Sequence, residues 1–199
     1  MASKLDILTN TSLKLGGDTI QSESLTGTES DPYEVTVLVN LYETIKINEL
    51  SNKEWNFNRE QIEASQLPTA PIDVDWSTKY SLPSPSLDLI AVTDKLTGTE
   101  ISYELRRGEI LCNVDTGVIC EYHADIDESE MPPYFVELLI ARLCKESAYA
   151  LTTDINLKQQ FDEDYRQALY DAKLADSNTT PADTFIADDT SSYLRARSL

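Results

Sequence analysis

A single histidine and three cysteines decide which catalytic chemistries this sequence could support. A Ser-His-Asp or Cys-His centre would have to use His123, but Cys120 is three residues away and so points to the opposite face of any strand. We therefore expect His123 to be a surface residue at the end of a strand. Cys112, Cys120 and Cys144 also lack the paired spacing of a zinc site, so no metal is predicted.

Carboxylates are the abundant reactive groups, and five of them lie between residues 121 and 130 without a base. Asp125 and Glu128 could act as the acid and base of a glycosidase. Asp125, Asp127 and Glu128 have the density of a calcium loop, but the glycine and the twelve-residue pattern are missing. The simpler interpretation is a solvated acidic linker before a helix, and we predict no catalytic residue.

The six glycines have no spacing that forms a phosphate-binding loop of the dinucleotide or Walker type. No cofactor is predicted. Trp55 and Trp76 could stack on sugars, although Trp55, with apolar neighbours, is more typical of a core residue.

Across its 199 residues the chain has 35 acidic and 16 basic side chains, a formal charge of −19. Residues 55–130 hold fifteen acids and five bases, whereas residues 193–199 hold two arginines and no acidic side chain. This surplus of acidic side chains makes binding to nucleic acid or to an anionic membrane unfavourable, because both contacts need clustered Lys and Arg. We expect a soluble protein made in a cytoplasm.

Four segments are expected to form helices. The first is 3–15, ended by Gly16-Gly17, and the second runs from Asp31-Pro32 to about Asn52. A third helix begins at Met131-Pro132-Pro133 and is apolar nearly all round, and Thr153-Asp154 caps a fourth that runs to about Ala175.

Between these helices the pattern predicts four or five short antiparallel strands. They include an alternating segment from Trp55 to Glu63, then 87–92, 101–104, 109–113 and 118–122. The prolines between 67 and 86 indicate a loop or an edge strand.

The predicted fold is α+β, a four-helix bundle with an inserted small antiparallel β-sheet subdomain. Residues 1–54 and 131–176 form the bundle, 55–130 the inserted subdomain, and 177–199 an extended C-terminal arm.

Several short strings, in this order, resemble the head-to-tail connector or adaptor proteins of short-tailed bacteriophages, the family of tail tubular protein A. The first is the opening helix 7–16 with its Leu15-Gly16 stop, and the second is Trp55-Asn56-Phe57 after the second helix. The third is Tyr80-Ser81-Leu82-Pro83 before the strand 87–90. The fourth is Met131-Pro132-Pro133-Tyr134-Phe135 with the closing helices, followed by Tyr193-Leu194-Arg195-Ala196-Arg197. The sequence departs from the family at Asn58, where relatives often have a small apolar residue, and in its acidic run before Met131.

The resemblance implies a virion protein without catalysis, assembled in the host cytoplasm and located in the tail or neck. It implies a homo-oligomeric ring, usually a dodecamer, bound under the portal protein and joined to the tail nozzle protein, with DNA passing through its lumen. The bundle would form the ring and the arm would reach the portal. The residues implied for portal contact are Tyr193, Leu194, Arg195, Arg197 and Leu199.

Two other functions remain open at this point. One is a two-carboxylate cell-wall hydrolase of the tail, using acids from 121–130. The other is an acidic assembly chaperone, monomeric and absent from the finished particle. For a ring, the acidic surplus suggests a lumen that repels DNA, although net charge also keeps free subunits apart.

Overall fold

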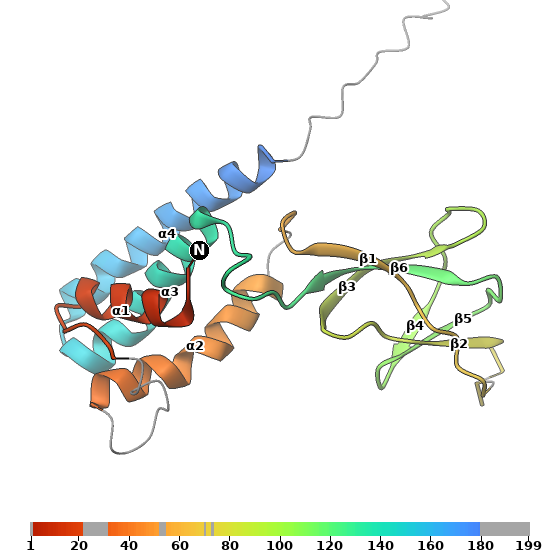
Figure 1. Cartoon of the computed structure of the whole chain (residues 1–199), viewed down its shortest axis with the longest axis horizontal. Coiled ribbons are helices and arrows are strands. Elements are labelled where there is room, and N and C mark those ends of the chain that lie inside the picture. The colour runs from red at the N-terminus through yellow and green to blue at the C-terminus, as the bar shows by residue number, and fades with distance from the viewer. Residues whose placement is uncertain (1, 22–31, 52–54, 70, 73, 180–199) are drawn as a thin grey trace, which may run out of the picture.

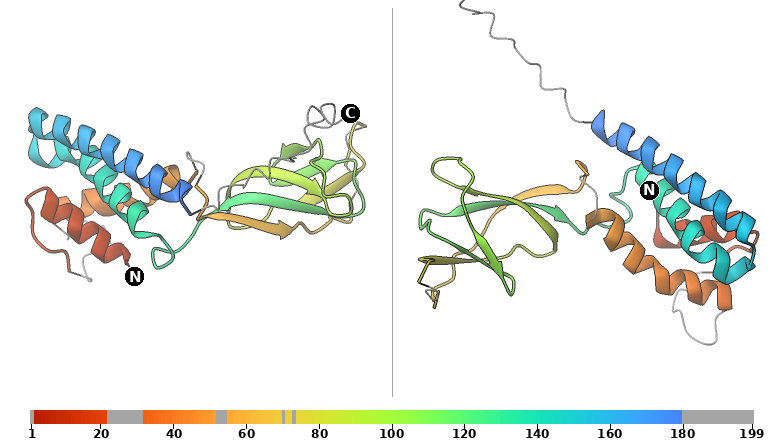
Figure 2. Two further views of the ribbon diagram at one scale, coloured as in Figure 1. Left: turned by 90° about the horizontal axis from the view of Figure 1, so that it is seen from above. Right: turned by 180° about the vertical axis from the view of Figure 1, so that it is seen from behind.

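The computed structural model describes residues 2–21, 32–51, 55–69, 71–72 and 74–179, and these form a mixed α+β fold (Figure 1). Its helices are α1 (Lys4–Lys14), α2 (Tyr33–Ser51), α3 (Pro133–Thr152) and α4 (Ile155–Ser177). Its strands are β1 (Arg59–Glu63), β2 (Thr78–Ser81), β3 (Ser86–Asp94), β4 (Glu104–Arg106), β5 (Glu109–Cys112) and β6 (Val118–Ala124). The helices form one lobe and the strands another, here called the helical lobe and the β lobe (Figure 2).

Local capping sets most of the helix boundaries. Ser3 and Asp6 form a capping box at the start of α1, and Gly16 follows its end with a φ of 88°. Pro133 begins α3, and Thr153 ends it in the left-handed conformation. Asp154 then caps α4 by accepting hydrogen bonds from the N–H groups of Asn156 and Leu157.

The helical lobe is organised around α3, which packs against α1, α2 and α4. Nine of its residues are buried, including Phe135, Leu138, Leu139 and Leu143. A helix buried on so many sides is expected at the centre of a packed unit. The predicted central position of this helix is therefore confirmed.

The β lobe contains two three-stranded antiparallel sheets, in the orders β1-β6-β3 and β2-β5-β4. Val92, Val118 and Cys120 from the first sheet share an apolar core with Tyr80 and Ile110 from the second. Two sheets that bury side chains between them in this way pack face to face.

Several strand predictions were wrong in their limits. There are six strands among the described residues, one more than the upper number predicted. The segment 67–86, predicted as a loop or an edge strand, does contain an edge strand, since β2 lies at the edge of its sheet. Residues 55–58 are not part of β1, since Trp55 is 1% exposed in the helical core. The strand expected at 101–104 begins instead at Glu104, the first residue that pairs with β5.

None of the helices in the described ranges is long and apolar enough to cross a membrane.

Candidate functional site at the junction of the two lobes

The five residues implied for portal contact, Tyr193, Leu194, Arg195, Arg197 and Leu199, lie outside the described residues, as does most of the predicted arm. The structure does place the point from which they depart. Thr179 closes the end of α4, donating from its N–H and its hydroxyl to the carbonyl oxygen of Asp176 at 3.0 and 2.6 Å. This point lies beside the connections between the two lobes (Figure 1).

The connection from α2 to β1 is held by Trp55 and Asn58. The Trp55 indole donates to the carbonyl oxygen of Glu49 at 2.8 Å. Asn58 is 1% exposed, and its amide donates to the carbonyl oxygens of Leu50 and Ala124, both at 3.3 Å. One side chain therefore joins the end of α2 to the end of β6, which a small apolar residue could not do.

Aromatic rings fill the space between this connection and the start of α3. Phe135 lies 5.4 Å from Trp55 and 4.9 Å from Phe57, measured between ring centroids, and Phe57 lies 6.0 Å from Tyr134. Their tilted and edge-on arrangements are those that aromatic pairs prefer.

A buried carboxylate, Asp176, ties the end of α4 to the same place. It is 3% exposed, and its two oxygens accept from the Asn56 N–H and the Tyr134 hydroxyl, each at 2.8 Å. Burial together with this carboxylate raises the pKa of Tyr134, so the phenol stays protonated and remains a donor. Asp176 therefore joins α4, the start of α3 and the α2–β1 connection.

The connection from β6 to α3 is held by an ionic network. Lys46 of α2, only 7% exposed, lies 3.0 Å from Asp125 Oδ1 and 3.7 Å from Glu128 Oε1. The Tyr42 hydroxyl also donates to Glu128 Oε1 at 2.9 Å. The predicted solvated linker is therefore also a paired one at these two acids: their side chains are 37% and 21% exposed, and both face the buried Lys46 ammonium.

Electrostatics around Glu128 favour its charged form. Burial alone would raise the pKa of this carboxyl, but its backbone hydrogen bond, the Tyr42 hydroxyl and Lys46 together lower it. Burial and the neighbouring Glu128 raise the pKa of Tyr42. Both residues therefore keep the protonation states that their hydrogen bond requires.

His123 is not the surface residue that was predicted, since it is 4% exposed. It belongs to β6, the central strand of its sheet, where it pairs with Arg59 of β1 and Asp88 of β3. The end of β6 also contacts α2, a tertiary contact that no pattern within the strand reveals.

Cys112, Cys120 and Cys144 are buried free thiols, and burial raises the pKa of both Cys120 and Cys144 to about 11. Within the described ranges, no group of three or more His, Cys, Asp or Glu side chains could hold a metal ion.

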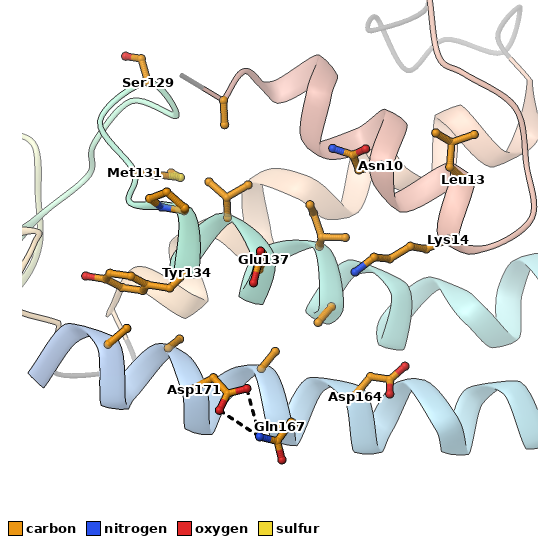
Figure 3. A pocket seen from close by; sticks show the side chains of 18 residues that line it. Asn10, Leu13, Lys14, Ser129, Met131, Tyr134, Glu137, Asp164, Gln167 and Asp171 are labelled. Carbon is orange, nitrogen blue, oxygen red and sulfur yellow. Dashed lines mark hydrogen bonds between the residues drawn. The ribbon is translucent and has the colours of Figure 1, made fainter. Parts of the chain in front are cut away.

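A groove of about 1310 Å³ starts at this junction and runs along the helical lobe between α1 and α4 (Figure 3). Its floor is α3, and Tyr134 and Ala175 line it near the junction. The other lining residues include Asn10, Leu13 and Lys14 from α1, Val136, Glu137 and Ile140 from α3, and Asp164, Gln167, Ala168 and Asp171 from α4. Val136 and Ile140 line the floor with apolar groups, and Glu137 adds a carboxylate to it.

Lys46 allows the ionic network to be tested. We expect Lys46→Met to lower the free energy of unfolding by about 2 kcal/mol, because Asp125 and Glu128 would then face each other without a cation. Because the pKa of Glu128 lies below its ordinary 4.5, wild-type stabilisation is complete above that pH and is lost as the pH falls below it. As the pH falls through this range, the Lys46→Met variant should therefore lose less free energy of unfolding than wild type, as measured by urea unfolding. Lys173→Met, at an exposed position of α4, is the control and should change stability by less than about 0.5 kcal/mol; an equal effect would contradict the network's role.

Comparisons with known proteins give no assignment. No protein-family model matches the chain, and no curated protein matches it.

Proposed function

We propose that this chain is a structural virion protein, one subunit of an adaptor ring that joins the portal protein to the tail nozzle protein. In this proposal the four helices form a bundle in the ring wall, and the β lobe faces the nozzle. Residues 177–199 form an extended arm whose Tyr193, Leu194, Arg195, Arg197 and Leu199 contact the portal. The DNA passes through the lumen without specific binding.

The junction is the observation that best supports this proposal. Both connections between the lobes are pinned, one by Asn58 and the other by Lys46, and Asp176 fixes the end of α4 there. A subunit that holds two neighbours at a set spacing needs its binding elements to start from one rigid body. The arm would begin at that fixed point, and its Tyr and Arg side chains are types that often dominate binding energy.

Asp125 and Glu128, the acids of the hydrolase alternative, both lie within 4 Å of the Lys46 ammonium. This ion pairing gives them a structural role, which supports the adaptor proposal over the hydrolase.

Mass measurement of the chain mixed with its portal protein tests the proposal. An adaptor should add a fixed number of copies to each portal ring and stay bound. A chaperone would remain monomeric or dissociate, and either result would contradict the ring.

A further prediction concerns the charge of −19. In an assembled ring we expect acidic side chains to line the lumen, because like charge keeps the duplex from adhering to the wall. The structure of the ring measures this directly. A lumen lined by bases, with the acids outside, would show that the surplus serves only to keep free subunits apart.

A further inference from the structure

The groove between α1 and α4 carries an excess of negative charge. Figure 3 shows Glu137, Asp164 and Asp171 along it, and among the described residues that line it only Lys14 is basic. All three acids are exposed. In the part of the chain that the structure describes, none of them belongs to an ion pair, whereas Asp162 of the same helix α4 pairs with a lysine at 3.0 Å. The groove therefore favours a basic occupant.

Apolar side chains lie between these charges. Val136 and Ile140 line the groove from α3, and Leu13, which is 50% exposed, lines it from α1. Ala168 and Ala175 contribute small side chains from α4, so the backbone of an occupant can approach this helix closely. An occupant should therefore combine cationic with apolar side chains.

One segment of this chain has that composition. Residues 190–199 contain two bases and no acidic side chain, and no other run of ten residues in the sequence does. Their last seven residues, 193–199, are here called the tip and place Arg195 and Arg197 among Tyr, Leu, Ala and Ser residues. The preceding residues 180–192 contain three aspartates, which the groove acids would repel. Charge and apolar character therefore select the tip and not the segment before it.

The chain between α4 and the tip is long enough to bring the tip to the groove. Thr179 is four residues beyond Ala175, which lines the junction end of the groove. The α4 wall runs from Ala175 back to Asp164, a length of about 17 Å. Residues 180–192 can span up to about 45 Å, and seven extended residues cover about 23 Å. The tip can therefore reach every part of the groove.

Attachment to the same chain also favours this occupant over a second copy. A tethered segment meets its site at an effective concentration of about 1 mM. A tip that binds as a free peptide with a Kd of about 0.1 mM would then occupy its own groove about 90% of the time. Separate subunits at about 1 μM present the same tip at a concentration about a thousandfold lower.

We propose that the tip, residues 193–199, docks in the groove of its own chain before assembly. Its arginines pair with the groove carboxylates, and its Tyr and Leu side chains cover the apolar floor. A docked tip is inaccessible to other proteins until a partner that binds it more tightly displaces it. This consequence rests on the proposed adaptor, whose portal contacts are the same side chains, and it gives the free subunit a closed arm that opens on the portal.

Paramagnetic labelling of the full chain locates the tip. Ser198→Cys introduces a thiol for a nitroxide label, and the three native cysteines are buried. We expect the label to broaden the amide signals of Leu13 and Ala168, which line the groove, and to leave that of Leu96 unchanged. Leu96 follows β3 at the end of the β lobe that lies away from the junction.

Charge variants of the labelled chain test what holds the tip. Asp164→Asn with Asp171→Asn removes two groove charges and should weaken docking about tenfold, so that the broadening falls by about half. Glu100→Gln with Asp127→Asn removes the same charge at exposed positions outside the groove and should leave the broadening unchanged. Thermal unfolding verifies that each variant is folded.

The tip provides a reciprocal variant that alters none of the described residues. Arg195→Gln with Arg197→Gln should reduce the broadening at least as much as the groove variant. Three results would overturn the inference. They are a wild type without broadening at the groove, charge variants that broaden like wild type, and broadening that arises only between labelled and unlabelled copies in a mixture.

Portal binding separates this inference from the adaptor proposal. Because its tip is less often docked, the groove variant should bind portal rings about fivefold more tightly than wild type. Equal affinity would contradict the closed arm. A chain whose tip docks but which never joins a portal would disprove the adaptor alone, and a chain that joins a portal although its tip never docks would disprove docking alone.

Discussion

Replacing Asp176 with alanine is expected to lower the free energy of unfolding by about 3 kcal/mol. The substitution leaves the Asn56 N–H and the Tyr134 hydroxyl without their acceptor at a position that is 3% exposed. A buried donor that loses its partner costs about 1–3 kcal/mol. Urea unfolding monitored by far-UV circular dichroism measures the loss.

Two further variants separate the causes of this effect. Asp176→Asn keeps one carbonyl acceptor and should lose roughly half as much stability. Asp171→Ala, at an exposed position of the same helix, should change stability by less than about 0.5 kcal/mol. If Asp176→Ala matched Asp171→Ala, the carboxylate would not be holding α4 to the junction.

Deleting residues 181–199 is expected to abolish binding to portal rings while leaving the protein folded. In the part of the chain that the structure describes, the buried members of the apolar cores run from Ile7 to Ala172, so the deletion leaves all of these in place. Losing several anchor side chains should weaken portal binding by at least about 100-fold, since single hot-spot residues each contribute about 2 kcal/mol or more. Co-sedimentation with portal rings measures the binding.

Charge variants of the arm refine this experiment. Arg195→Glu with Arg197→Glu should weaken portal binding by at least about tenfold, whereas Asp188→Asn with Asp189→Asn, in the same segment, should leave it unchanged. Portal binding that survives the deletion would assign the main anchor to another part of the chain.

The amino-acid sequence predicted those helices whose ends are set by residues close to them in the chain. The Asp154 cap, the Gly16 stop and the proline at the start of α3 all act within one helical turn, so a short stretch of sequence predicts them. Strand limits were predicted less well, because Trp55 belongs to the helical core although its segment alternates like a strand.

Features of the junction were missed because they depend on residues far apart in the chain. Asn56 and Asp176 are 120 residues apart, and Lys46 meets Asp125 only when α2 contacts the β lobe. Asn58 is a junction residue that the sequence singled out. Its two hydrogen bonds, to the carbonyl oxygens of Leu50 and Ala124, give this buried amide a structural role.

The most direct test of the adaptor proposal is an electron cryomicroscopy image of the particle that contains this chain. The proposal predicts a closed ring of copies below the portal, with residues 193–199 against the portal and the β lobe toward the nozzle. Absence of the chain from the finished particle, or its presence at a tail position remote from the portal, would contradict it.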